Sequence, residues 1–261
     1  MRCQKHGYSK KVESHPVVVA SSRATIACVR EGNHMCFSAE ASFAGGAIIS
    51  AIGVATVTKV HKPSQLIFAC IPLFFGLQQI TEGCLWLALR YPDVGNLQRF
   101  STYLFLVMAE VIWPILIPLS VLLMEEDRKR SKVLWLLLFM GGALALYLAY
   151  CLLFYKVNPR IMGHHIQYST DFPLSLRTWA LLVYLSVTIA PLFVSSIKRT
   201  HLLGVLMFLS CAVSVIFFTQ FLTSVWCFFA AMISGVIFWI LRDSKRKFHL
   251  DGLRLLKDNF V

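Results

Sequence analysis

Long apolar runs separated by short polar segments occupy the chain from residue 43 almost to its end. The hydrocarbon core of a bilayer is about 30 Å thick, and a helix needs about 20 apolar residues to cross it. Seven runs are close to that length or longer, and they cover residues 43–60, 65–89, 100–124, 133–155, 176–197, 202–218 and 221–241. Because lipid offers the backbone no hydrogen-bonding partner, each run is expected to be helical. The pattern therefore predicts an all-α fold, an integral membrane bundle of about seven transmembrane helices.

The composition favours a membrane protein over a soluble domain. Hydrophobic residues make up 57% of the chain and charged residues 15%, and the mean hydropathy is +0.67. A soluble domain is roughly half apolar and a quarter charged. Five of the eight cysteines fall within the predicted spans, and no pair has C-x-x-C spacing. We interpret these cysteines as packing residues, because a disulfide framework would cluster in the loops.

The net charge of +12 comes largely from basic residues in the short segments between spans. At or close to the span ends, the side of the membrane reached after the first, third, fifth and seventh spans carries 12 Lys and Arg residues, and the opposite side carries 5 between residues 90 and 177. By the positive-inside rule, the start of the first span lies outside and the C-terminus is cytoplasmic. The expected location is the cell membrane, with membrane lipids as partners of the basic residues. No basic groove with interleaved aromatic residues is apparent, so nucleic acid is not an expected partner.

The two ends of the chain differ from its apolar middle. Residues 1–34 are polar and basic, and they lack the long apolar stretch of a secretory signal peptide. We expect a disordered N-terminal extension there; the alternative is an organelle transit peptide, against which its two acidic residues argue. Residues 35–242 are predicted to form the seven-span membrane domain, and residues 243–261 a basic cytoplasmic tail.

Small residues and prolines set expectations for two of the spans. Gly45, Gly46 and Gly53 in the first span permit close contact between helices, so this helix is expected in the interior of the bundle. Pro114 and Pro118 in the third span remove two backbone donors and are expected to bend it.

Polar side chains within the second and third spans are the main candidates for a functional site. The second span contains Gln78, Gln79 and Glu82, and the third contains Glu110. A carboxylate inside a bilayer costs at least a few kcal/mol unless it is protonated, paired or hydrated, so such a residue is functional by default. In the predicted topology both carboxylates lie in the outer half of the membrane on consecutive helices. We predict that these four residues form a substrate or proton site, and the alternative is that the acids are hydrogen-bond partners that hold helices together.

The long outer loop at residues 156–177 contains further candidates, His164, His165 and Asp171. Neutral imidazole and carboxylate oxygen are both ligands of divalent metals such as zinc. A possible metal site therefore comprises these three residues with Glu82, and a divalent metal ion is the possible cofactor. The alternative is that the adjacent histidines only solvate the loop.

The segment at residues 35–43, which reads Met-Cys-Phe-Ser-Ala-Glu-Ala-Ser-Phe, resembles the start of a family of uncharacterised multi-pass bacterial membrane proteins. Further similarity lies at residues 78–86, 163–166 and 224–230, and the resemblance covers about residues 35–242. The resemblance implies a polytopic membrane protein in the inner membrane of a bacterium, and it carries no activity with it. The seven-span hydrolases of the alkaline ceramidase and adiponectin receptor type differ, because they have H-x-x-x-H in the last span and the spans predicted here contain no histidine.

Three functions remain open from the sequence. The first is an outward-facing polar cavity, built around Glu82 and Glu110, that binds or transports a small solute, a proton or a metal ion. The second is a membrane-embedded, metal-dependent lipid hydrolase in which one of these acids is the base. The third is a non-catalytic sensor or assembly subunit in which the acids are structural.

Overall fold

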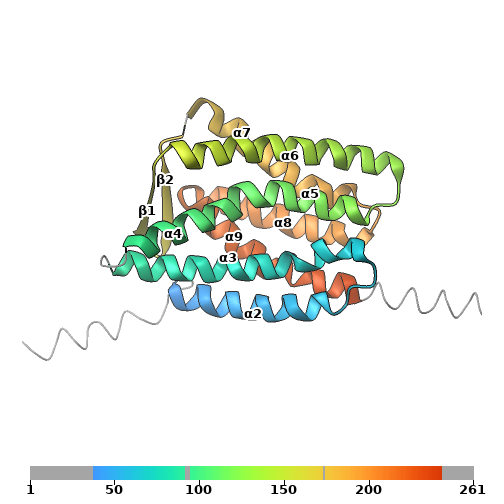
Figure 1. The fold of residues 1–261 in the computed structure, drawn as a ribbon, viewed down its shortest axis with the longest axis horizontal. Coiled ribbons are helices and arrows are strands. Elements are labelled where there is room, and N and C mark those ends of the chain that lie inside the picture. Colours follow the sequence, from blue (N-terminus) through green and yellow to red (C-terminus); the bar gives the residue numbers. More distant parts are fainter. Residues whose placement is uncertain (1–37, 92–94, 173, 243–261) are drawn as a thin grey trace, which may run out of the picture. The chain divides into compact units, whose positions relative to one another are not determined.

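The computed structural model of the protein describes residues 38–91, 95–172 and 174–242, and the described part of the chain is a helical bundle (Figure 1). The predicted N-terminal extension and basic tail lie outside the described residues. The helices of the described bundle are α2 (Ala39–Val57), α3 (Leu66–Arg90), α4 (Gly95–Leu106), α5 (Trp113–Met124), α6 (Arg128–Phe154), α7 (Leu174–Val194), α8 (Lys198–Phe217) and α9 (Leu222–Ser234). After Gly235 the last helix continues over residues 236–242. The prediction of an all-α bundle is confirmed.

Short elements connect these helices. Single 3-10 turns precede α3 (Pro63–Gln65) and α9 (Thr219–Phe221), and a π-helical turn (Val107–Ile112) joins α4 to α5. Two strands, β1 (Val157–Met162) and β2 (His165–Thr170), form an antiparallel hairpin that crosses one end of the bundle (Figure 1).

Six helical segments of the described chain are long and apolar enough to cross a membrane. They are Ala39–Val57, Pro63–Arg90, Gly95–Met124, Arg128–Phe154, Lys198–Phe217 and Thr219–Arg242. The seventh bundle helix, α7, contributes a shorter apolar segment, Thr178–Val194. The chain thus has several apolar helices, as a multi-span membrane protein has.

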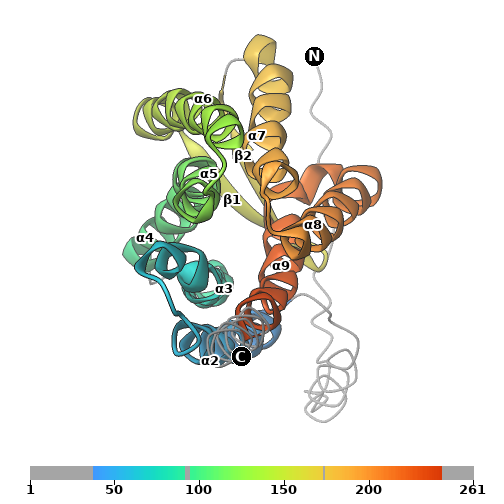
Figure 2. The ribbon, with the colours of Figure 1, turned by 90° about the vertical axis from the view of Figure 1, so that its right-hand side faces the viewer.

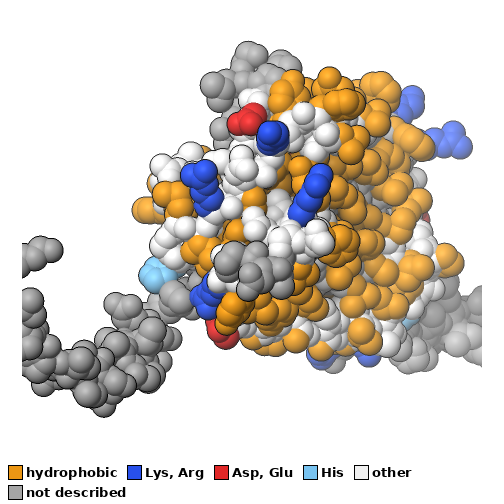
Figure 3. Space-filling model, turned by 60° about the vertical axis from the view of Figure 1, so that its left-hand side comes forward, with side chains coloured by type: hydrophobic (Ala, Val, Ile, Leu, Met, Phe, Trp, Pro, Cys, Tyr) orange, Lys and Arg blue, Asp and Glu red, His pale blue; other side chains and the backbone are white. Residues whose placement is uncertain are grey.

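The flank of the bundle is apolar (Figure 3). On α6, for example, the side chains of Phe139, Leu146 and Leu153 are each at least 75% exposed. A soluble monomer rarely shows so extensive an apolar surface, whereas lipid covers it without cost.

Helix α3 has the largest buried share of the six long segments, 61%. It packs against α2, α4, α5 and α9, and it also contacts β1. Its inner face combines large apolar side chains, such as Phe68 and Phe75, with polar ones. Phe75 stacks on Trp113 of α5 with ring centroids 4.0 Å apart. Helix α3 is therefore the helix around which its neighbours are arranged.

Helices α2 and α3 approach each other closely through small residues, as predicted. A methyl group added at Gly46 would lie 2.8 Å from the Ile80 side chain, and one added at Gly76 would overlap Ser50. The expectation that α2 is interior is wrong, because α2 lies at the edge of the bundle (Figure 2). Only 33% of this helix is buried, because its small residues lie on one face, and only that face contacts other helices.

The loops that follow α2, α5 and α7 meet at the end of the bundle opposite the hairpin. Lys62 forms an ion pair with Glu126, with 3.0 Å between Nζ and Oε1. The backbone N–H of Ser196 donates to the Glu125 carboxylate over 2.7 Å. Most of the described Lys and Arg residues lie at this end, in these loops or in the adjacent helix ends, which agrees with the alternating charge pattern of the sequence.

The segment predicted as a long outer loop contains the hairpin instead. The strands pair from Val157 with Thr170 to Met162 with His165, so residues 163 and 164 form the turn. Gly163 has φ +62°, a conformation that favours glycine and that tight hairpin turns require. Apolar and polar residues alternate over residues 157–161, and this alternation and the glycine of the turn are sequence signals that the loop interpretation missed.

The prolines of α5 lie beside the π-helical turn. The N–H of Trp113 donates to Met108, five residues back, so the carbonyl of Ala109 lacks its usual α-helical partner. Pro118 has no N–H to offer the carbonyl of Pro114. The sequence predicts a bend here, and the structure has a π-helical turn beside the prolines, which leaves carbonyl groups available to neighbouring helices.

Gly141 of α6 lies against the Pro114 carbonyl, and a methyl group there would overlap the carbonyl oxygen. At the adjacent Gly142, an added methyl group would have no neighbour within 4 Å. We expect Gly141→Ala to lower the free energy of unfolding by about 1–3 kcal/mol, because α6 must move away from α5. Gly142→Ala is the matched control, and it should be neutral or stabilising by up to about 1 kcal/mol. Thermal unfolding of the detergent-purified proteins measures both, and equal melting temperatures for the two variants would contradict the close contact.

Candidate functional site

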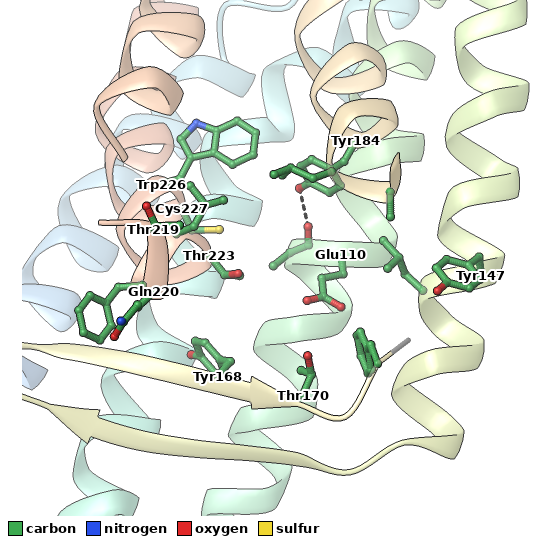
Figure 4. Close-up of a pocket in the computed structure, with 17 residues that line it drawn as sticks. Glu110, Tyr147, Tyr168, Thr170, Tyr184, Thr219, Gln220, Thr223, Trp226 and Cys227 are labelled. Atoms are coloured by element: carbon green, nitrogen blue, oxygen red, sulfur yellow. Dashed lines mark hydrogen bonds between the residues drawn. The ribbon is translucent and has the colours of Figure 1, made fainter. Parts of the chain in front are cut away.

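A cavity of about 190 Å³ lies at the hairpin end of the bundle (Figure 4). The cavity is lined by residues of the π-helical turn, of the C-terminal half of α6 and of α7. Strand β2, Phe172 after it, and the start of α9 with the 3-10 turn before it complete the wall. Segments far apart in the sequence therefore meet here. Its labelled lining residues are Glu110, Tyr147, Tyr168, Thr170, Tyr184, Thr219, Gln220, Thr223, Trp226 and Cys227.

Glu110 is the predicted site residue that lines this cavity, and its carboxylate points into it (Figure 4). The residue belongs to the π-helical turn. π-helical turns are rare and frequently occur at functional sites. The hydroxyl of Tyr184 in α7 donates to the carbonyl of Ala109 over 2.5 Å. The Ala109 carbonyl, which the π-helical turn leaves without its α-helical partner, thereby holds Tyr184 in place, and Tyr184 is a second residue that lines the cavity.

Glu82 lies elsewhere. It is 2% exposed and is not among the lining residues. The hydroxyl of Ser224 in α9 donates to its Oε1 over 2.5 Å. The structure therefore does not place Glu82 and Glu110 together in one outward-facing cavity, because Glu82 faces the α3–α9 interface.

Gln78 and Gln79 are completely buried on α3, one turn before Glu82. The Gln78 Oε1 accepts a 2.7 Å hydrogen bond from the indole Nε1 of Trp113 in α5. The Gln78 Nε2 and both polar side-chain atoms of Gln79 have no hydrogen-bond partner within the described part of the chain. These two residues form, with Glu82, a buried polar stripe on α3 rather than a part of the cavity wall.

The predicted loop residues are spread along the hairpin. His164 is exposed at the turn, and Asp171 is exposed just beyond β2. His165 is half-buried, and its ring lies 4.8 Å from that of Phe221, a cavity-lining residue. Burial lowers the pKa of the His165 imidazole, and the charge of His164 lowers it further. His165 thus packs as a largely neutral ring behind the mouth of the cavity.

The four residues predicted as possible metal ligands are not gathered into one site. Within residues 38–91, 95–172 and 174–242, no group of three or more His, Cys, Asp and Glu side chains could hold a metal ion. The hypothesis of a metal-dependent lipid hydrolase therefore finds no ligand set in these ranges.

Tyr168 of β2 interacts electrostatically with both Glu82 and Glu110. Its hydroxyl is buried and has no hydrogen-bond partner among the described residues. Burial raises the pKa of the Tyr168 phenol well above its usual value, and the carboxyl groups of Glu82 and Glu110 raise it further. Its ring is stacked on Phe105, with 5.2 Å between centroids. Tyr168 therefore stays protonated, as a neutral wall of the cavity.

Sequence reasoning missed the aromatic lining from α6, α7 and α9. Tyr147, Tyr184 and Trp226 lie within long apolar runs, where an aromatic residue is usually a packing residue. Besides Glu110 itself, the sequence has one more signal in this region, Pro114, because a proline four residues after that acid disturbs the helix around it.

Residues 35–250 match the family described as "Family of unknown function (DUF6629)", and the chain belongs to this family. The resemblance to an uncharacterised family is confirmed by that match. Searches of curated proteins and of solved structures gave no match.

The hydroxyl of Ser224 is expected to stabilise the fold through Glu82. Ser224→Ala should lower the free energy of unfolding by about 1–3 kcal/mol, because it leaves a buried carboxyl group without its hydrogen bond. Ser234→Ala is the control: Ser234 is equally buried on α9, but its hydroxyl bonds to Ala231 of the same helix. Thermal unfolding in detergent compares the two, with Ser224→Thr as the conservative variant. If Ser224→Ala costs no more than Ser234→Ala, the interhelical bond is unimportant.

Proposed function

We propose that this chain is a multi-span membrane protein that binds a small water-soluble molecule in the cavity at the hairpin end. The observation that carries the proposal is the Glu110 carboxylate on the wall of this cavity. A charged group at membrane depth is costly, and such groups commonly mark binding sites and pathways. Binding sites for small molecules combine apolar walls with a few convergent polar groups, which is the composition seen here.

The exposure of the lining residues supports entry from the hairpin end. Thr219 and Gln220 are exposed, whereas Trp226 and Cys227 are buried. The cavity thus has a rim in contact with solvent and a closed base between the helices. From the distribution of basic residues we propose that the hairpin end faces outward and that the C-terminus is cytoplasmic. From the resemblance to bacterial membrane proteins we propose that the membrane is the inner membrane of a bacterium.

The volume restricts the size of the molecule. Sites for drug-sized ligands usually measure about 300–1,000 Å³. A cavity of about 190 Å³ suits a solute of only a few heavy atoms. A lipid could place no more than part of its headgroup there.

A cysteine reporter on the cavity wall tests the proposal. Thr223 lines the cavity, and Thr223→Cys is introduced into the full chain after the native cysteines have been replaced. In liposomes this thiol should react with a small water-soluble methanethiosulfonate. A panel of small polar solutes is then screened for those that slow the reaction, because a molecule bound in the cavity shields the thiol.

Met232→Cys, prepared in the same background, is the matched control. Met232 lies on the same helix, and its side chain is 48% exposed on the apolar flank. A thiol facing lipid ionises poorly, so the reporter at position 223 should react at least about tenfold faster. A folded protein whose reporter at position 223 is no more reactive than the control would show that solutes do not reach the cavity, and the proposal would fail.

A further inference from the structure

The buried polar stripe on α3 lies next to one wall of the cavity. Gln78 and Glu82 are four residues apart, so they share a face of α3. Ser224 and Cys227 are three residues apart and share a face of α9 in the same way. Ser224 is bonded to Glu82, and Cys227 lines the cavity. Because the Cys227 side chain also interacts with Gln78 and Glu82, it has the cavity on one side and the stripe on the other.

Tyr168 of β2 belongs to the same wall (Figure 4). Its ring packs in one apolar cluster with Cys227, and in a second cluster with Leu85 and Trp86 of α3. These two residues of α3 lie about one turn after Glu82, with which Tyr168 interacts electrostatically. Tyr168 and Cys227 therefore contact both the cavity and the surroundings of Glu82.

Several polar atoms on the two sides of this wall have no hydrogen-bond partner among the described residues. They are the Gln78 Nε2, both polar side-chain atoms of Gln79, the Tyr168 hydroxyl and the Trp226 Nε1. Leaving one such buried group unpaired costs about 1–3 kcal/mol. Internal water commonly satisfies groups of this kind, and each water molecule needs about two to four polar partners. The unpaired atoms are sufficient to hold water between the cavity and the stripe.

Glu82 is expected to carry a proton. Ser224 donates to its Oε1, and no Lys, Arg or His of the described chain forms an ion pair with it. The ionisable side chains that interact with Glu82 from neighbouring described elements are Tyr168 and Cys227, which supply no positive charge. A buried carboxyl group without a counter-ion becomes neutral by binding a proton. Gln79 lies beside the carboxyl group, and its unpaired Oε1 can accept the hydrogen bond of that proton, directly or through water.

We infer that water from the cavity reaches Glu82 past Tyr168 and Cys227, and that Glu82 exchanges its proton with the solvent by this route. In each exchange the carboxyl group gives one proton to water and takes one back, so its charge does not change. The inference rests on the proposed function for the access of water to the cavity, but it requires no solute. A solute bound in the cavity would displace this water, so binding and proton exchange would exclude each other.

Infrared spectroscopy of the full chain in liposomes tests the inference. The C=O band of a protonated carboxyl group lies apart from the amide bands, and it shifts when a deuteron replaces the proton. Glu82→Gln should remove the band of Glu82. Ser224→Ala should raise its frequency, because the carboxyl oxygen loses a hydrogen bond. If neither variant changes a carboxyl band, Glu82 is not protonated and the inference fails.

Transfer of the liposomes into D₂O measures the exchange. The amide bands of the same spectra provide the reference, because buried backbone N–H groups exchange only when helices open. The Glu82 band should shift well before the slow phase of the amide exchange, since no helix has to open for water to pass through the cavity. A Glu82 band that shifts only with this slow phase would overturn the inference.

A plug in the cavity tests the route. Thr223→Cys in the cysteine-free background is modified to completion in detergent with benzyl methanethiosulfonate, which adds an aromatic ring to a cavity of about 190 Å³. After reconstitution, Glu82 should exchange only in the slow amide phase. The unmodified protein and modified Met232→Cys are the controls, and both should exchange Glu82 before that phase. An early shift in the plugged protein would show that water reaches Glu82 by another route, which would contradict the inference.

Tyr168→Phe tests the part of the hydroxyl group in this route. Rapid mixing with D₂O should show Glu82 exchanging at least about tenfold more slowly than in the wild type, because a positioned proton-transferring group commonly contributes about 100-fold or more. Tyr150→Phe, whose side chain is 53% exposed on the flank of α6, should exchange at the wild-type rate. Equal rates for the two variants would remove the Tyr168 hydroxyl from the route.

The reactivity of the Thr223→Cys thiol separates this inference from the proposed function. A reactive thiol, together with a Glu82 band that shifts only in the slow amide phase, would overturn the inference and leave the solute cavity. A thiol as unreactive as that of Met232→Cys would show that the cavity is closed to water, and both the inference and the proposed function would fail.

Discussion

A polar group buried in an apolar bundle must find its partner on a neighbouring helix, and this constraint organises the structure around α3. Lipid and apolar side chains offer no hydrogen bonds, so each buried polar group favours one arrangement of helices over others. On α3, Glu82 accepts from Ser224 of α9, and Gln78 accepts from Trp113 of α5. Apolar packing alone would tolerate rotation or sliding of these helices. The two hydrogen bonds select a single register.

The same constraint explains how the cavity forms. The π-helical turn deprives the Ala109 carbonyl of its helical partner, and the Tyr184 hydroxyl of α7 takes its place. The open carbonyl of Pro114 is approached by Gly141 of α6. Helices α6 and α7 are thus brought to the irregular part of the third span, where their aromatic residues become the cavity wall. The irregularity that turns Glu110 toward the cavity also assembles the groups around it.

Much of the architecture follows from sequence, because the periodicity and length of apolar runs identify helices without tertiary information. The candidate site was less predictable. Glu110 was recognised because an acid in a span is costly, but its separation from Glu82 depends on helix rotation, which a π-helical turn changes by an amount that periodicity does not reveal. The hairpin was missed although Gly163 and the alternating residues of β1 indicate it. The aromatic wall could not be predicted, since an aromatic residue facing a cavity and one facing the core look alike in an apolar run.

The two intramembrane acids illustrate why depth in a membrane is insufficient to assign function. Glu82 is almost completely buried, and a hydroxyl group from another helix bonds to it. The hydrogen bond from Ser224 to this carboxyl group fixes the register of α3 and α9. A ligand would have to break that hydrogen bond to reach the carboxyl group. Glu110 instead presents its carboxylate to a cavity with a solvent-exposed rim at Thr219 and Gln220. The cost of burying Glu82 is offset by a hydrogen bond between two helices, whereas Glu110 lies on the wall of a cavity.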